Sequence, residues 1–130
     1  TPVVSDGSTH VYYVYGLKVD PNIIGINRAR LVEALRAEGV PGLVEGYQNI
    51  HRLPLFRNRI AYGRHGFPWI SGVCKRDISY QEGDCPIAED LYDRTFFGLN
   101  LCAHDYNEEQ INLITMAFLK VWSNLAQLTM

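Results

Sequence analysis

The sequence lacks the features that identify several large classes of protein. It has three cysteines, an odd number with no C-x-x-C pair, which argues against a disulfide framework and a zinc knuckle. No metal site is therefore expected, and reduced thiols favour a cytoplasmic protein. No apolar run approaches the roughly 20 residues that cross a membrane. The start shows no charged stretch followed by an apolar run, so no signal peptide and no membrane partner are expected.

An excess of charge of one sign is also missing. The chain has 12 Lys and Arg against 14 Asp and Glu, which gives a net charge of −2. Without a basic stripe, nucleic acid is an unlikely partner by composition. The length of 130 residues and the hydrophobic fraction of 47% are typical of one globular domain spanning residues 1–130. The chain begins with Thr1, which is compatible with a fragment of a longer protein, although a removed initiator Met would look the same.

Two kinds of periodicity predict the secondary structure. Alternating side chains predict a strand over residues 10–19. A short strand is predicted over residues 43–47, and a third over 95–101, which is apolar and contains two Phe. Apolar side chains at helical spacing predict a helix that starts at Asn27 and ends at Gly39.

The C-terminal part of the chain adds two helices. Pro86 in a first turn predicts a short helix over residues 85–92. Asn107 and Gln110 form a capping-box pattern that predicts the start of the final helix. The apolar stripe predicted for that helix is Ile111, Ile114, Phe118, Val121, Trp122, Leu125 and Leu128.

This order of elements, β-α-β-loop-α-β-α, predicts the fold class. It indicates an α+β domain with a small, mainly antiparallel three-stranded sheet and helices on one face. Residues 52–83 are the least regular part and contain several Gly and Pro with interleaved aromatic residues. Because disordered segments are poor in aromatics, this segment is expected to be a long ordered loop.

The segment 46–56 contains the strongest candidates for a binding site. Tyr47 and His51 lie four residues apart just after a predicted strand, where a phenol and an imidazole can bind a polar ligand. In the long loop, Arg64 can bind a phosphate or carboxylate through two parallel hydrogen bonds. The alternative remains open that Tyr47 fills a core edge, His51 is a structural histidine and Arg64 is a solvated side chain.

Other polar residues have simpler explanations. The three lysines, Lys18, Lys75 and Lys120, are expected on hydrated surfaces, where a nucleophilic amine would not form. The acidic pairs at residues 89–90 and 108–109 fall in first turns of helices, where the helix dipole favours negative charge. The residues alone therefore show no complete catalytic apparatus.

Five short motifs follow one another along the chain: residues 10–15, 28–40, Y-Q-N-I-H at 47–51, C-P-I-A-E-D-L at 85–91 and N-E-E-Q-I at 107–111. In this order they resemble the C-terminal small domain of the DegT/DnrJ/EryC1/StrS family, which are pyridoxal-phosphate-dependent sugar aminotransferases of the aspartate-aminotransferase fold. The last three are similar to the family's Y-x-P-L-H, P-x-A-E-x-L and T-x-E-E-I motifs. Two positions depart from the family: Asn49 stands in place of the usual Pro, and residues 97–101 lack the usual Leu-Pro pair.

The resemblance implies that the chemistry is divided between two domains. A large domain outside this chain would bind pyridoxal phosphate, and this chain would close the pocket without catalytic or cofactor-binding residues. It implies substrate-binding roles for Tyr47 and His51, and for Arg64 and Trp69 if the long loop folds back over the cleft. The implied substrates are a nucleotide-linked ketosugar and an amino-acid donor, typically glutamate, and the implied full-length enzyme is a homodimer.

Two further expectations complete the hypothesis. The G-F-P-W sequence at 66–69 is similar to a subgroup that acts on nucleotide-linked sugars for surface polysaccharides. The alternative is a free-standing α+β ligand-binding or interaction module with no catalytic role.

Overall fold

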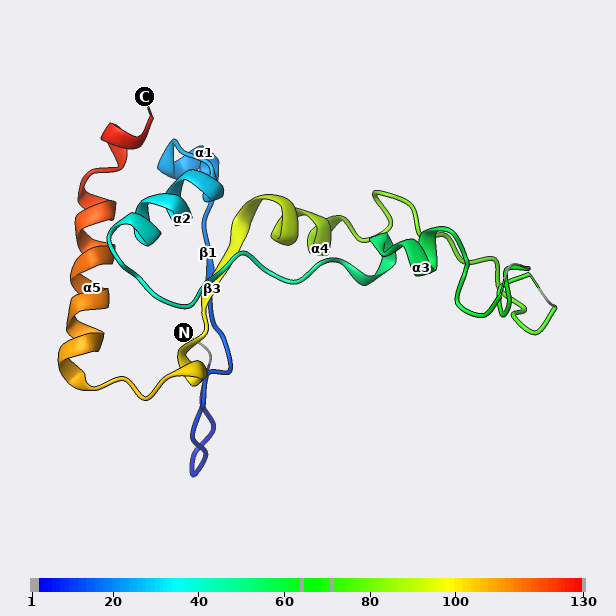
Figure 1. Ribbon diagram of the computed structural model, residues 1–130, viewed down its shortest axis with the longest axis horizontal. Coiled ribbons are helices and arrows are strands. Elements are labelled where there is room, and N and C mark those ends of the chain that lie inside the picture. Colours follow the sequence, from blue (N-terminus) through cyan, green and yellow to red (C-terminus); the bar gives the residue numbers. More distant parts are fainter. Residues whose placement is uncertain (1–2, 64, 71, 130) are drawn as a thin grey trace. The chain divides into compact units, whose positions relative to one another are not determined.

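A small antiparallel sheet forms the centre of the first of two units into which the chain divides. The computed structural model describes residues 3–63, 65–70 and 72–129. Unit 1 contains residues 3–45 and 94–129, and unit 2 contains Gly46–Asp93. The α+β fold class is confirmed (Figure 1). Whether the whole chain behaves as one domain stays a prediction.

The sheet of unit 1 has three strands in the order β1-β3-β2. These are β1 (Tyr15–Lys18), β2 (Leu43–Val44) and β3 (Phe96–Leu99), and both outer strands run antiparallel to β3. Leu99 pairs with Tyr15 on one side and with Leu43 on the other. All three predicted strands exist, but each is shorter than the sequence indicated.

The largest shortening is in the first strand, which was predicted over residues 10–19. Tyr12 has a φ of +43°, a left-handed conformation that interrupts an extended strand. Val11 and Tyr13 lie before the paired region and are exposed. The alternating pattern therefore placed the start of the strand at residue 10, whereas β1 begins at Tyr15.

Helix α2 (Arg28–Ala37) buries one face in the core of unit 1, and the short α1 (Pro21–Ile24) precedes it. The side chain of Asn27 caps its first turn by accepting from the Arg30 amide at 2.8 Å. Gly39 ends it with a φ of +84°, as predicted. Leu31, Val32 and Leu35 are fully buried, which confirms the predicted apolar face.

The long helix α5 (Glu108–Ser123) contacts α2, which in turn contacts β3. Both bonds of the predicted capping box are present: Gln110 N donates to Asn107 Oδ1 at 2.9 Å and Asn107 N donates to Gln110 Oε1 at 3.0 Å. Short 3₁₀ turns at Leu101–Ala103 and Leu125–Leu128 flank the helix. The buried hydrophobic core consists of Val19, Ile26, Leu31, Val32, Leu35, Val40, Phe97, Leu99, Ala117 and Val121.

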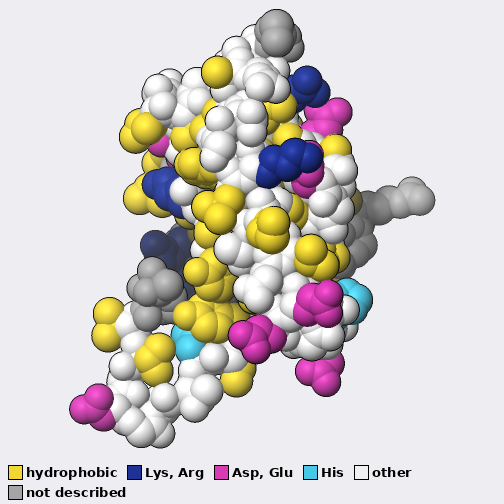
Figure 2. All heavy atoms as spheres, turned by 90° about the vertical axis from the view of Figure 1, so that its left-hand side faces the viewer, with side chains coloured by type: hydrophobic (Ala, Val, Ile, Leu, Met, Phe, Trp, Pro, Cys, Tyr) yellow, Lys and Arg dark blue, Asp and Glu magenta, His cyan; other side chains and the backbone are white. Residues whose placement is uncertain are grey.

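Two members of the predicted α5 stripe are wrong as core residues. Ile111 is 40% exposed and Trp122 is 45% exposed, because they lie at the edge of a stripe whose centre is Ala117 and Val121. The outer surface of the helix is itself partly apolar. Figure 2, which views the molecule from the α5 side, shows hydrophobic side chains there, and the exposed ones on α5 include Leu113, Met116 and Leu119.

Unit 2 has little regular structure. It contains the 3₁₀ turn η1 (Ile50–Arg52), α3 (Pro54–Arg57) and α4 (Pro86–Asp90), and the π-turn η2 (Leu91–Thr95) leads from it into β3. The predicted helix over 85–92 is confirmed as α4, with Cys85 as N-cap and Pro86 in the first turn. No hydrophobic side chain of its described residues is fully buried. No helix of the described parts of the chain is long and apolar enough to span a membrane.

Candidate functional site

The segment that contains Tyr47 and His51 connects β2 to the helical part of unit 2. After Val44 it is extended, and it then forms η1, in which His51 is the central residue. Pro54 occupies the first turn of the next helix, α3, where its missing amide costs no hydrogen bond. The residue Tyr47 is 68% exposed, whereas the side chain of His51 is only 12% exposed. The structure therefore gives the two residues different surroundings.

His51 forms a hydrogen bond with a helix residue 38 positions away. Its Nε2 lies 2.8 Å from Oε1 of Glu89 on α4. In the same region the side-chain amide of Asn49 donates to the backbone carbonyl of Ala88 at 3.3 Å. The segments 47–51 and 85–91, which are two of the five motifs, are therefore in direct contact.

Glu89 is buried, and amide groups surround its carboxylate. Gly83 N lies 2.9 Å from Oε2 and 3.0 Å from Oε1, and Cys85 N donates to Oε1 at 3.3 Å. Burial by itself would raise the pKa of Glu89. The hydrogen bonds from Gly83, His51 and Cys85, together with the charge of Arg52, outweigh it and lower that pKa to about 2.

Arg52 extends this cluster on one side. Its Nη1 donates to both carboxylate oxygens of Asp93, at 2.8 Å and 2.9 Å, and its Nη2 lies 3.3 Å from Glu89 Oε2. The hydrogen bond to Asp93 raises the pKa of the Arg52 guanidinium, against the effect of burial. We refer to His51, Arg52, Glu89 and Asp93 as the His51–Glu89 cluster. It connects the start of unit 2 to its end.

Trp69 belongs to a separate aromatic cluster within the long loop. Its indole N–H donates to the Tyr80 hydroxyl at 3.0 Å, and its ring meets those of Phe56 and Tyr80 edge-on, each with centroids 6.2 Å apart. These contacts lie within unit 2, and the order of the long loop stays a prediction. Arg64, the fourth predicted site residue, lies outside the described residues. The substrate-binding roles of Tyr47, His51, Arg64 and Trp69 stay predictions.

The sequence reasoning missed the partners of His51. It explained Glu89 by the helix dipole, which accounts for the bond from the Cys85 amide at the N-cap but not for His51 or Arg52. No sequence pattern assigned a role to Asp93. The only sequence signal was a carboxylate in a short helix that also contains Pro86, and nothing in that signal indicates a partner 38 residues away.

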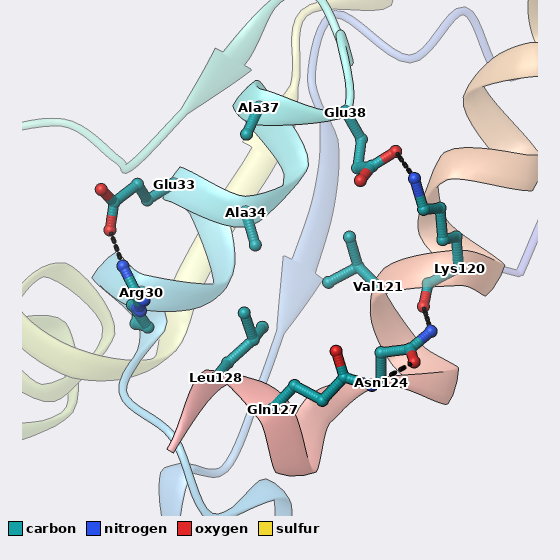
Figure 3. A pocket seen from close by; sticks show the side chains of 10 residues that line it. All are labelled: Arg30, Glu33, Ala34, Ala37, Glu38, Lys120, Val121, Asn124, Gln127 and Leu128. Carbon is teal, nitrogen blue, oxygen red and sulfur yellow. Dashed lines mark hydrogen bonds and ion pairs between the residues drawn. The ribbon is translucent and has the colours of Figure 1, made fainter. Parts of the chain in front are cut away.

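A groove in unit 1 has an apolar floor near the core. It has a volume of about 380 Å³ and lies between α2 and the end of α5, with Ala34, Ala37, Val121 and Leu128 in its lining (Figure 3). Ion pairs occupy its rim: Arg30 with Glu33 at 2.8 Å, and Lys120 with Glu38 at 2.7 Å. Its charged side chains are therefore already paired with one another, and it contains no predicted site residue.

Comparison with known proteins gives two distant similarities. The chain is 29% identical over 79 residues to the spore coat polysaccharide biosynthesis protein SpsC of Bacillus subtilis (strain 168). It is 27% identical, also over 79 residues, to the uncharacterized protein MJ1066 of Methanocaldococcus jannaschii. In each case the match covers 61% of this chain and 20% of the relative, so the matched segment spans a fifth of these curated proteins. No family model matches the chain, and no solved structure matches it.

Proposed function

We propose that this chain is the C-terminal, substrate-side domain of a longer pyridoxal-phosphate-dependent aminotransferase of the DegT/DnrJ/EryC1/StrS family. The parent enzyme would move an amino group from an amino-acid donor to a nucleotide-linked ketosugar in polysaccharide biosynthesis, and would act as a homodimer. The observation that carries the proposal is the similarity to SpsC, a polysaccharide biosynthesis protein of which the match covers only 20%. The five motifs in family order add to it.

The contact between two of those motifs supports the same proposal. Segments 47–51 and 85–91 are far apart in sequence, yet a hydrogen bond joins His51 and Glu89 between them. If the resemblance to the family were a coincidence, there would be no reason for these two motifs to lie next to each other in the structure. On this proposal the His51–Glu89 cluster fixes the segment from which Tyr47 projects, and the exposed Tyr47 ring is the group that faces substrate.

The residues of this chain do not fit pyridoxal phosphate itself. The lysine that binds this cofactor needs a desolvated setting. Lys18 and Lys75 are exposed, and Lys120 is exposed and bonded to Glu38. The proposal therefore assigns cofactor binding and the chemical steps to the rest of the longer polypeptide, and no step of the reaction to this chain.

The genomic reading frame upstream of Thr1 gives the first test. An open frame of several hundred residues agrees with the proposal. A stop codon followed by a start site immediately upstream would contradict it and favour the free-standing module. Stable, stoichiometric binding of pyridoxal phosphate by this chain alone, seen as a visible absorption band, would also contradict it.

Kinetics of the longer polypeptide give the second test. Tyr47→Phe removes one hydroxyl from an exposed ring, so we expect kcat/KM for the nucleotide-linked sugar to fall by about two- to tenfold, the worth of one hydrogen bond. Cofactor retention is expected to stay unchanged. Tyr62→Phe, which removes the same group from another exposed ring, is the control. Wild-type kinetics for Tyr47→Phe would refute the substrate-side role of this ring.

His51→Ala is also expected to lower the turnover of the sugar substrate, and to lower the retention of the cofactor by less. A second variant, Glu89→Gln, tests the same role through the partner of His51. It removes the charge that orients His51 and leaves the imidazole itself unaltered. If His51 acts through the cluster, both variants will give the same loss in kcat/KM. Wild-type kinetics in both would leave His51 with a structural role alone.

A further inference from the structure

The long loop of unit 2 differs in charge from the rest of the chain. Residues 52–83 contain six Lys or Arg and two acidic residues, Asp77 and Glu82, although the whole chain has a net charge of −2. The loop also contains five aromatic residues. A locally basic segment within an acidic chain attracts anions to that segment and not to the remaining surface.

Part of this charge lies around one cavity. The cavity has a volume of about 170 Å³, and the side chains around it include Arg59, Trp69, Lys75, Arg76 and Asp77. Its volume is below the roughly 300 Å³ of a pocket that encloses a drug-sized ligand, so it suits one group of a ligand rather than the whole molecule. Three of these five side chains are cationic and one is anionic.

Arg59 is held in place at this cavity. Its Nη2 donates to the Ile78 carbonyl at 2.9 Å and to Asp77 Oδ1 at 3.2 Å. Its φ of +52° is the left-handed conformation that ends α3, where the Arg59 amide donates to the Phe56 carbonyl and the Ile60 amide to the Leu55 carbonyl, each at 3.1 Å. The guanidinium is therefore oriented before any ligand arrives, which lowers the entropic cost of binding.

The remaining cations are not neutralised. Asp77 is 95% exposed and is the only carboxylate among the lining side chains. Lys75 and Arg76 are exposed, and among the described residues neither forms an ion pair. The cavity therefore keeps an excess of positive charge, with the indole of Trp69 as its apolar side.

We propose that this cavity is an anion subsite that binds a phosphate or diphosphate group. Arg presents a planar fork that matches phosphate oxygens, and Lys binds phosphate as a compact charge. Resting on the proposed function, the ligand is the diphosphate of the nucleotide-linked sugar, and this subsite would select phosphorylated substrates. The free anion is the other source of the same chemistry.

Binding to the 130-residue chain tests the subsite directly. Inorganic pyrophosphate, uridine diphosphate and uridine are titrated separately, and the shifts of backbone amide resonances of residues 74–78 are followed by NMR. We expect pyrophosphate and uridine diphosphate to shift these amides and uridine to leave them unchanged. Absence of shifts with both phosphorylated probes would overturn the proposal, as would equal shifts with uridine.

Variants then show whether anions bind at this cavity or are attracted by the positive charge of the whole loop. Lys75→Gln and Arg76→Gln are each expected to weaken pyrophosphate binding by roughly two- to fivefold, the worth of a partly screened exposed ion pair. Arg57→Gln is the matched control, because Arg57 is an exposed cation of the same loop outside the cavity lining. Wild-type affinity in Lys75→Gln and Arg76→Gln, or an equal loss in Arg57→Gln, would overturn the proposal.

The two phosphorylated probes distinguish the sources of the ligand. Tighter binding of uridine diphosphate than of pyrophosphate supports a nucleotide-linked ligand, and equal binding assigns the subsite to the free anion. These measurements need no catalytic activity. If the longer polypeptide shows no transaminase activity, the proposed function fails and the anion subsite stands; if the amides do not respond, the subsite fails and the proposed function stands.

Discussion

The two units are stabilised by different interactions. The described residues of unit 1 bury ten hydrophobic side chains, from its strands, its helices and the segments next to them, around Leu31, Val32 and Leu35. In the described part of unit 2 no hydrophobic side chain is fully buried, and the one buried charged side chain is the carboxylate of Glu89. Burial of apolar surface is nonspecific and insensitive to pH, whereas a carboxylate held by ion pairs and amides depends on both protonation and salt. The comparison indicates that unit 1 is the scaffold and unit 2 the region whose order solution conditions can change.

The largest expected effect is in the core of unit 1. Leu35→Ala removes a fully buried side chain of α2, and we expect it to lower the free energy of unfolding by about 2–5 kcal/mol. The measurement is urea unfolding followed by circular dichroism. Leu55→Ala is the matched control, because Leu55 lies in unit 2 and is 41% exposed, so its loss is expected to stay below about 1 kcal/mol. Equal losses from the two variants would contradict the contrast between the units.

The second effect is specific to unit 2 and depends on pH. The pKa of Glu89 is lowered to about 2 from a usual value of 4.5. The folded state therefore favours the carboxylate, and its contribution to stability is complete above pH 4.5 and is lost as the pH falls toward 2. We expect unit 2 to lose order in this window while the core of unit 1 remains.

The two tryptophans report the units separately, because Trp69 lies in unit 2 and Trp122 in unit 1. In a Trp122→Phe background, Trp69 emission is expected to change during acid titration. The protection factors of the Gly83 and Cys85 amides, each taken relative to the intrinsic exchange rate at the same pH, are expected to fall. Glu89→Gln is expected to show fast exchange already at neutral pH and to lack the acid transition. Glu33→Gln, which alters an exposed carboxylate of unit 1, should leave both measurements unchanged. An unaltered acid transition in Glu89→Gln would exclude this carboxylate as its cause.

The same division explains which features could be predicted from the sequence. The cap at Asn27, the capping box at Asn107 and the buried face of α2 depend on residues within one or two helical turns, so local spacing was sufficient. The ends of the strands were less predictable, because a strand is defined by its hydrogen bonds to a neighbouring strand. It therefore ends where that neighbour ends, and the neighbour is distant in sequence. Trp122 was wrongly predicted to be a core residue. Periodicity identifies the apolar side of α5, but it does not show how many side chains on that side are buried against α2.

The site was harder to predict than the fold for a related physical reason. Tyr47 and His51 were singled out from a local segment, but the group that fixes His51 is Glu89, 38 residues further along the chain. A polar contact between two irregular segments leaves no periodic pattern. The ring contacts of Trp69 with Phe56 and Tyr80 are likewise formed across a loop, so the sequence indicated only that the loop would be ordered.

The smallest expected effect tests whether hydrogen bonding or ring packing stabilises the aromatic cluster of unit 2. Tyr80→Phe keeps the ring but removes the hydroxyl that accepts from Trp69 Nε1 at 3.0 Å. Because both side chains are partly exposed, water replaces the lost partner, and we expect a loss of no more than about 1 kcal/mol together with a shift in Trp69 emission. Tyr62→Phe removes a hydroxyl from another ring contact of the same loop, with Phe67, and should leave Trp69 emission unchanged. A loss as large as that of Leu35→Ala would show that unit 2 depends on a few buried contacts, as unit 1 does, and the contrast between the two units would then fail.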